Sequence, residues 1–67
     1  METFGERLKL LREEKELSLC ALERETGINH GALSRWERGE RDILSHNLIK
    51  LADYFGVSAD YLLGRED

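Results

Sequence analysis

The 67-residue sequence contains no proline, one cysteine and two histidines. A single cysteine, Cys20, excludes an internal disulfide, which favours a reducing compartment or indifference to redox conditions. Cys20, His30 and His46 show no paired spacing, so we expect no structural metal site, and no cofactor is indicated. Because no linker or repeat interrupts the sequence, we interpret residues 1–67 as a single domain.

Long apolar runs are also missing. No stretch approaches the roughly 18 apolar residues of a transmembrane helix, so we expect no membrane association. The N-terminal residues include Glu2 and Glu6 and lack a long apolar core, which argues against a signal peptide. These absences together predict a cytoplasmic protein.

An enzyme is not expected either. A chain of this size buries only about 60% of its unfolded surface, which leaves little room for a shielded reaction centre. Cys20 with His30 or His46 is the only combination of Cys and His, and Cys20 lies in no recognisable nucleophile context. We interpret Cys20 as a small, semi-buried helix residue, and expect Cys20→Ala to leave function intact.

Capping residues and glycines predict five helices. No strand is expected, because no segment alternates apolar and polar residues for long enough. The expected helices cover about 4–15, 19–26, the stretch from after Asn29 to Gly39, 46–55, and a short segment after Ser58. The start signals are a Thr3/Glu6 capping box and the N-cap residues Ser18, Asn29 and Ser58. The end signals are Gly27, Gly39, Gly56 and Gly64, whereas Gly5 and Gly31 do not fall at the end of a helical segment.

Apolar residues at helical spacing predict the core of this all-α, compact five-helix domain. The expected core residues are Phe4, Leu8, Leu11, Leu17, Leu22, Thr26, Leu33, Trp36, Leu48, Leu51, Ala52, Phe55, Val57 and Leu62, with Leu10 placed to widen the first stripe.

The second and third helices, within about residues 18–39, form the pattern of a helix-turn-helix. Only a short turn through Gly27 and Asn29 separates them, with a glycine to leave one helix and an N-cap to begin the next. Leu22, Ile28 and Leu33 can meet inside the bend. Such a bend leaves one side of the third helix exposed and able to enter a major groove.

The ordered residues of nearly the whole chain resemble the phage repressor/Cro type of helix-turn-helix, the xenobiotic response element (XRE) family. The resemblance is carried by Leu17-Ser18, Leu22, Gly27-Ile28, Leu33-Ser34-Arg35-Trp36-Glu37-Arg38-Gly39, Leu48-Ile49-Lys50-Leu51-Ala52, Phe55-Gly56-Val57-Ser58 and Tyr61-Leu62-Leu63-Gly64. It implies a lambda-repressor-like domain that binds double-stranded operator DNA as a homodimer and regulates transcription, often as a repressor. The implied dimer surface is around Ser58 to Leu63.

The resemblance assigns base reading to the exposed early part of the third helix, which here carries His30, Gly31, Ser34 and Arg35. Arg35 is the strongest candidate because its planar fork matches both acceptors of a guanine edge. Each position also has a plainer interpretation. Arg35 can be a solvated residue paired with an acid, His30 a cap-region histidine, Gly31 a tolerated glycine and Ser34 an exposed serine.

Phosphate contacts are expected from Arg38, from Arg41 in the following loop, and near the helix starts at Ser18 and Asn47. The arginines can instead be loose surface residues, and Ser18 and Asn47 can serve only as caps or surface residues. Glu37 matches a position that is usually acidic and structural, so we interpret it as an internal ion-pair or cap partner.

Three departures from the family pattern stand out. Leu19 replaces a glutamine that often contacts DNA, so that contact is lost or becomes an apolar one. Glu23 replaces a small residue and must swing outward or place its carboxylate near the amides that start the third helix. Ile43-Leu44 replaces Pro-Ser, which makes the start of the fourth helix uncertain and exposes apolar surface.

Two alternatives remain beside an operator-binding regulator. A protein-interaction module of the antitoxin or anti-repressor type would use a surface of Ile43, Tyr54, Tyr61 and Leu63, although these residues also suit ordinary core and dimer packing. A restriction–modification controller protein is similar in size and helix pattern.

The charge distribution is compatible with DNA binding although the net charge is −4. Residues 1–27 carry 5 bases and 7 acids, residues 42–67 carry 2 bases and 5 acids, and residues 28–41 carry 3 bases and 2 acids. Only the segment with the third helix is positive, which predicts weak non-specific affinity, strong salt dependence and reliance on dimerisation.

Overall fold

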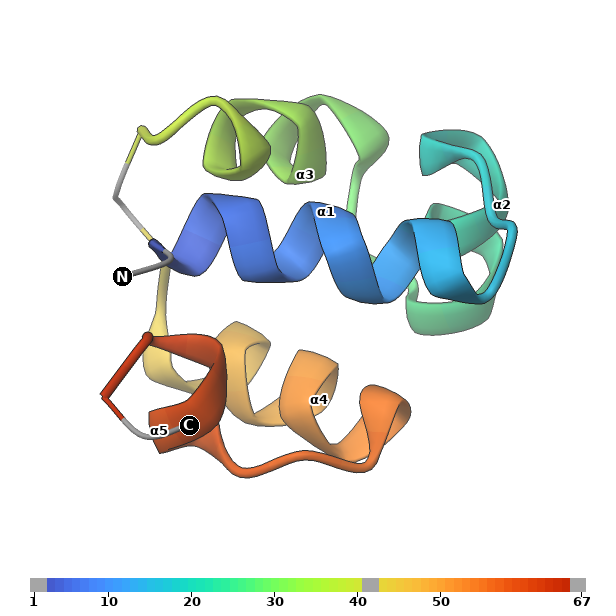
Figure 1. Ribbon diagram of the computed structural model, residues 1–67. Coiled ribbons are helices and arrows are strands. Elements are labelled where there is room, and N and C mark those ends of the chain that lie inside the picture. Colours follow the sequence, from blue (N-terminus) through green and yellow to red (C-terminus); the bar gives the residue numbers. More distant parts are fainter. Residues whose placement is uncertain (1–2, 41–42, 66–67) are drawn as a thin grey trace.

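The computed structural model describes residues 3–40 and 43–65. Within these residues the chain forms five helices and no strand, which confirms the all-α fold class (Figure 1). The helices are α1 (Phe4–Glu14), α2 (Leu19–Thr26), α3 (His30–Glu37), α4 (Ser45–Phe55) and α5 (Ala59–Leu62).

The predicted start signals of four helices are confirmed. Thr3 and Glu6 form the capping box of α1, and the side chains of Ser18, Asn29 and Ser58 accept backbone amides at the starts of α2, α3 and α5. The predicted start of α4 was one residue late, because α4 begins at Ser45. Leu44 occupies its N-cap position and provides no side-chain hydrogen bond, so the sequence offers no polar cap there.

Helix ends also differ slightly from the prediction. α1 ends at Glu14 and α3 at Glu37, with Lys15 and Arg38 as their C-cap residues. The four glycines predicted to end helical segments all have positive φ angles; the clearest are Gly27 and Gly56, which are the left-handed C-caps of α2 and α4. A side chain in that conformation would be strained.

The core joins residues from all five helices. The buried apolar residues are Phe4, Leu8, Leu22, Ile28, Leu33, Trp36, Leu51, Ala52 and Leu62. Other predicted core residues, Leu11, Leu17, Leu48, Phe55 and Val57, are half-buried against this cluster.

Three burial predictions were wrong. Leu10 is 46% exposed, so it does not widen the apolar stripe of α1. Thr26 is only half-buried, and its hydroxyl is used in hydrogen bonds of the turn. Cys20 is exposed rather than semi-buried.

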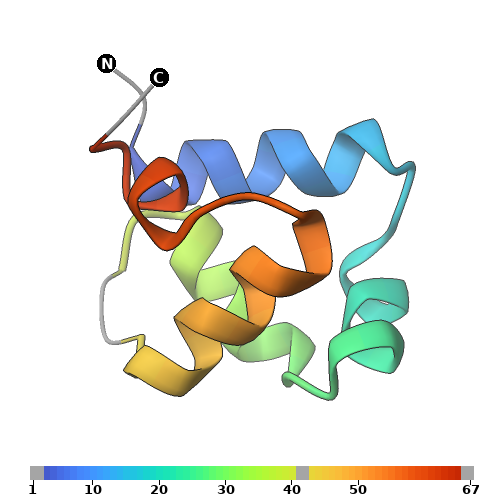
Figure 2. The same cartoon turned by 90° about the horizontal axis from the view of Figure 1, so that it is seen from below.

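α1 runs along one edge of the molecule (Figure 2), and the other helices pack on one side of it. In the view of Figure 1, α3 lies above α1 and α4 below it, and α2 closes one end of the molecule. Figure 2 shows α5 beside the first turns of α1, on the side to which α4 returns the chain. None of the helices in residues 3–40 and 43–65 has the length and apolar character needed to cross a bilayer.

Candidate nucleic-acid interface

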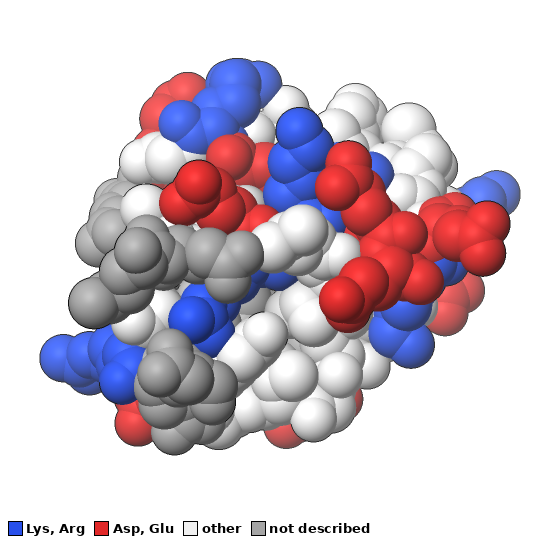
Figure 3. Space-filling model, in the orientation of Figure 1, with Lys and Arg blue, Asp and Glu red and all other residues white. Residues whose placement is uncertain are grey.

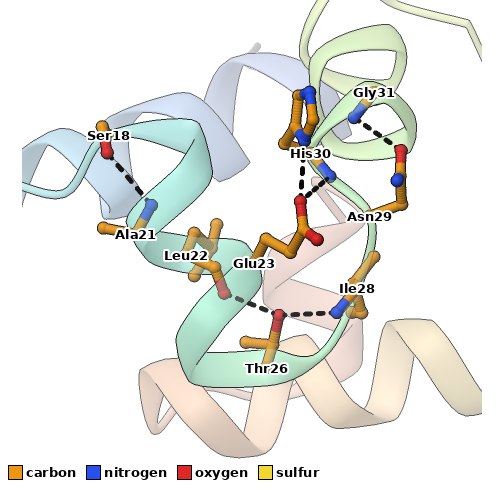
Figure 4. Close-up of polar contacts among 9 residues, drawn as sticks. All are labelled: Ser18, Ala21, Leu22, Glu23, Thr26, Ile28, Asn29, His30 and Gly31. Atoms are coloured by element: carbon orange, nitrogen blue, oxygen red, sulfur yellow. Dashed lines mark hydrogen bonds and ion pairs between the residues drawn. The ribbon is translucent and has the colours of Figure 1, made fainter.

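The turn between α2 and α3 is built by local hydrogen bonds that the sequence encodes. Gly27 leaves α2 with a φ of 78°, and its N–H donates to the Glu23 carbonyl. The Thr26 hydroxyl donates to the Leu22 carbonyl at 2.8 Å and accepts from the Ile28 amide at 3.2 Å (Figure 4). The amides of Gly27 and Ile28 are therefore both hydrogen-bonded within the turn, which favours this conformation.

The inner side of this bend is apolar, as the sequence predicted. Leu22 and Leu33 are fully buried and Ile28 is 6% exposed, so the three side chains close the angle between the two helices. The Asn29 side chain then accepts from the Gly31 amide at 2.8 Å and starts α3. Packing beneath and a cap at the start fix the direction in which α3 leaves the turn.

The outer side of α3 carries the predicted base-reading residues together. Leu33 and Trp36 turn into the core, whereas His30, Gly31 and Arg35 are exposed and Ser34 is half-buried. These four positions and Arg38 lie within one face of a helix with 3.6 residues per turn. The structure therefore presents the predicted set as one surface, which we call the α3 face: His30, Gly31, Ser34, Arg35 and Arg38.

Arg35 and Arg38 differ in their surroundings. Among the residues that the structure describes, no hydrogen-bond or ion-pair partner holds the Arg35 guanidinium, so its donors face solvent. The Arg38 guanidinium donates to Ser34 Oγ at 2.7 Å and lies 3.4 Å from a Glu40 carboxylate oxygen. Arg38 and Ser34 thus engage each other along the helix, and a ligand would compete with Glu40 for Arg38.

His30 is held from α2. Oε1 of Glu23 accepts from the His30 backbone amide at 2.9 Å and lies 2.7 Å from Nδ1 of the His30 ring (Figure 4). Of the two arrangements expected for Glu23, the structure has the one with its carboxylate at the start of α3. The His30 side-chain and backbone hydrogen bonds lower the pKa of Glu23 below its usual range, so the group is a carboxylate at neutral pH.

The remaining predicted phosphate contacts lie at other places. Ser18 is exposed, and its Oγ accepts from the Ala21 amide at 3.0 Å, so it serves at least as the cap of α2. Asn47 lies half-buried in the first turn of α4. Arg41 lies outside the described residues.

Leu19, one of the departures from the family pattern, is half-buried and packs against the core, so it has a structural role.

Two contacts that fix α3 against α1 support the α3 face from behind. The Arg12 guanidinium forms a two-pronged ion pair with the Glu37 carboxylate, at 2.7 and 3.0 Å, which confirms the interpretation of Glu37 as an internal ion-pair partner. A Cβ at Gly5 would collide with the Trp36 carbonyl oxygen and come within 2.9 Å of the Glu37 carbonyl oxygen. Gly5 therefore permits the close approach of α1 to the end of α3.

The charged side chains are distributed unevenly between the α3 face and the end of α1. Glu37 has its charge balanced by Arg12, whereas two other carboxylates lie beside the α3 face: Glu40 next to Arg38 and Glu23 next to His30. Figure 3 views the face that carries α1, where acidic side chains gather at the end next to α2. Glu13, Glu14 and Glu16 in that stretch are all exposed. The end of α1 is therefore predominantly acidic, although the exposed Lys15 lies in the same stretch.

Sequence reasoning missed one buried polar residue. Arg7 is only 6% exposed, donates from Nη1 to the Tyr61 carbonyl at 3.2 Å, and lies 4.3 Å from the centroid of the Tyr61 ring. It joins α5 to α1. The one sequence feature that points to burial of Arg7 is its position three residues after Phe4, which places both residues on the same side of α1.

The aromatic residues proposed for a protein partner are largely occupied within the domain. Tyr61 lies under Arg7, and Tyr54 packs edge-on against Phe55, with its hydroxyl 3.4 Å from a Glu25 carboxylate oxygen. Burial and the Glu25 carboxylate raise the pKa of Tyr54. The large apolar side chains that are exposed, among the described residues, are instead Leu10, Leu44 and Ile49, at 46%, 61% and 54%.

Comparison with known proteins places these features in a family. A model of the helix-turn-helix domain matches residues 5–67. Repressor protein C2 of Salmonella phage P22 is 34% identical over 62 residues, which are 92% of this chain and 29% of that protein. The HTH-type transcriptional regulator ImmR of Bacillus subtilis is 34% identical over 65 residues, which are 97% of this chain and 51% of that protein. The chain thus spans about half or less of the length of these relatives.

Solved structures agree with the sequence matches. The P22 c2 repressor, in a crystal structure with a synthetic operator, superimposes with a TM-score of 0.88 at 32% identity, over 98% of this chain and 100% of that chain. The restriction–modification controller protein C.AhdI from Aeromonas hydrophila superimposes with a TM-score of 0.78 at 34% identity, over 88% of this chain and 89% of that one. Both the all-α class and the lambda-repressor-like arrangement are confirmed.

Proposed function

Since the chain belongs to the helix-turn-helix domain family, we propose that it is a sequence-specific DNA-binding domain that regulates transcription by occupying an operator. The main support is the likeness, over 98% of this chain, to a repressor solved with operator DNA. In this proposal α3 lies in the major groove and the α3 face contacts the DNA. Repression follows because an occupied operator excludes other proteins.

The residues of the α3 face divide into two roles. Arg35 and His30 read base edges, because their polar groups are exposed on the early part of α3. Arg38, with Arg41 in the following loop, contacts phosphates, which positions the domain without reading sequence. Ser34 and Gly31 lie between these residues on the α3 face, and Ser18 and Asn47 would contact phosphates near the starts of α2 and α4.

A homodimer is the proposed DNA-binding form. Two copies of α3 about 34 Å apart would contact successive major-groove segments of a pseudo-palindromic operator. The proposed dimer surface is the segment from Ser58 to Leu63, in which Leu62 is buried and Leu63 is half-buried. Dimerisation adds the phosphate contacts that an acidic monomer lacks.

Selection from a random pool of double-stranded DNA tests the proposal. The 67-residue chain should enrich a pseudo-palindrome at low salt, with half-sites about one helical turn apart. A variant with both His30 and Arg35 changed to alanine is the matched control, because both side chains are exposed. It should keep its helical circular dichroism and lose the enrichment. A wild-type chain that enriches no sequence would refute the proposed function.

A further inference from the structure

The contact between Glu23 and His30 has chemistry that is not required for folding of the turn. Asn29 already caps α3 by accepting from the Gly31 amide. Glu23 adds a second acceptor from the preceding helix, and a single oxygen, Oε1, meets both the backbone amide and the ring Nδ1 of His30. The His30 side chain is still 55% exposed, so the contact fixes the ring without burying it.

The carboxylate determines which ring nitrogen carries the proton. An ionised carboxylate has acceptor sites only, and the lowered pKa of Glu23 keeps it ionised at neutral pH. The Nδ1 atom, 2.7 Å away, must therefore carry a hydrogen. In a neutral imidazole the other nitrogen, Nε2, is then an acceptor. Figure 4 shows this second nitrogen at the end of the ring that points away from Glu23.

We propose that Glu23 is a positioning residue that holds His30 in its Nδ1–H form, so that Nε2 accepts a hydrogen bond from an exocyclic amino group of a base in the major groove. The inference rests on the proposed function, which places the α3 face in that groove. Adenine N6 and cytosine N4 are the amino donors available there, whereas guanine presents the acceptors O6 and N7 and thymine the acceptor O4. The neutral ring thus favours adenine or cytosine and disfavours guanine and thymine at one operator position.

The tautomer is measured first, without DNA. Long-range proton–nitrogen correlation spectra of the ¹⁵N-labelled chain distinguish a protonated from an unprotonated ring nitrogen. In the neutral state, His30 should show a protonated Nδ1 and an unprotonated Nε2. Glu23→Ala should move the proton to Nε2, while His46, on α4, serves as an internal control that does not change. A wild-type His30 with its neutral proton on Nε2 would overturn the inference.

Base preference is measured second, at a pH at which the same spectra show the ring to be neutral. The wild-type chain should prefer adenine or cytosine over guanine by about five- to tenfold at one position of each half-site. Separate substitution of adenine and cytosine at that position identifies which amino group is read. Glu23→Gln keeps an oxygen for the His30 amide and adds an amide donor for Nδ1, so it permits the opposite tautomer while retaining the turn. It should reduce or reverse the preference.

A double-variant cycle separates positioning from a general effect on folding. His30→Ala should abolish the same preference, and Glu23→Gln combined with His30→Ala should cause no further change at that position. If the wild type selects an operator but the Glu23 variants prefer the same bases at every position, this inference fails and the proposed function stands. If the wild type selects no sequence at all, the proposed function itself fails.

Discussion

Arg12 and Glu37 join the end of α1 to the end of α3 across 25 residues of sequence. The Arg12 Nε and Nη2 atoms donate to the two Glu37 carboxylate oxygens, and Nη1 donates to the Leu17 carbonyl at 2.7 Å. Their side chains are only 13% and 8% exposed. The pair therefore fixes three segments, α1, α3 and the approach to α2, and it does so behind the α3 face.

Breaking this pair should destabilise the domain. Arg12→Ala leaves the Glu37 carboxylate and the Leu17 carbonyl without their donors in a poorly hydrated place, at a cost of about 2–4 kcal/mol of unfolding free energy. Urea unfolding followed by circular dichroism measures it. Arg24→Ala, on the exposed side of α2, is the control and should change stability by less than about 0.5 kcal/mol. Equal stability of the two variants would show that the pair contributes nothing.

Gly5 should be intolerant of a methyl group although it lies in a helix. A Cβ there meets backbone atoms of Trp36 and Glu37, which cannot move aside without shifting α3. Gly5→Ala should therefore cost about 1–3 kcal/mol despite the better helix propensity of alanine. At Gly31 the close atom is the Asn29 side-chain oxygen, at 2.9 Å, which also accepts from the Gly31 amide. Gly31→Ala therefore weakens this cap but gains helix propensity, so it should cost less stability than Gly5→Ala, and thermal unfolding of the two variants distinguishes these outcomes.

The Arg12–Glu37 pair and the close approach at Gly5 differ from the turn between α2 and α3 in how far they can be predicted from sequence. Short-range signals such as Gly27 and Asn29 specify the turn within a few residues, so the helix-turn-helix and its exposed face were predicted correctly. The Arg12–Glu37 pair and the approach at Gly5 join positions far apart in the chain. Their partners depend on how α1 crosses α3, which no local pattern encodes. Glu37 was recognised as an ion-pair partner, but Arg12 was not identified.

The α3 face likewise combines features that local sequence predicts with features that depend on packing between helices. Placement of His30, Ser34 and Arg35 on one face follows from helical geometry, and the structure agrees. The sequence left two positions open for the Glu23 carboxylate, because the choice depends on the angle between α2 and α3. Leu10 fits the core stripe by spacing, yet it is 46% exposed, because spacing alone does not show how far around α1 the core extends.

Acid should weaken the domain through two carboxylates at helix starts. The Thr3 backbone and side-chain hydrogen bonds lower the pKa of Glu6, and those of His30 lower the pKa of Glu23, from the ordinary value of 4.5. The folded state therefore binds these protons less tightly than the unfolded chain. The resulting stability is present above about pH 4.5 and is lost as the pH falls through the lower, folded-state values.

Glutamine variants isolate this effect from the capping geometry. Glu6→Gln keeps the capping-box pattern but cannot titrate. The double variant Glu6→Gln/Glu23→Gln should be less stable than the wild type at about pH 7 and should lose less stability between about pH 7 and pH 3. Urea midpoints at several pH values measure the difference. Parallel pH profiles for the double variant and the wild type would contradict the prediction, and Glu14→Gln, at an exposed position of α1, is the control.

The contact between Arg7 and Tyr61 should stabilise α5 more than the rest of the domain. Arg7→Met retains an apolar stem of similar length but loses the hydrogen bond to the Tyr61 carbonyl and the stacking on its ring. Hydrogen exchange at the Leu62 and Leu63 amides, which donate to carbonyls of the preceding turn, should become faster. Exchange in α3 should change less. A uniform acceleration throughout the chain would instead indicate global destabilisation.

Arg35 and Arg38 should affect DNA binding in different ways, because only Arg38 is engaged by neighbouring side chains of the domain. Arg35→Ala should cost about 1–3 kcal/mol for the selected operator and relax specificity at one base position. Arg38→Ala and Arg41→Ala should each weaken binding to every sequence and reduce the slope of log affinity against log salt by about 0.9 per lost phosphate contact. Fluorescence anisotropy with operator and scrambled duplexes at several salt concentrations separates the two patterns. If Arg35→Ala weakened operator and scrambled duplexes equally, Arg35 would contact a phosphate and the base-reading role would pass to the remaining residues of the α3 face.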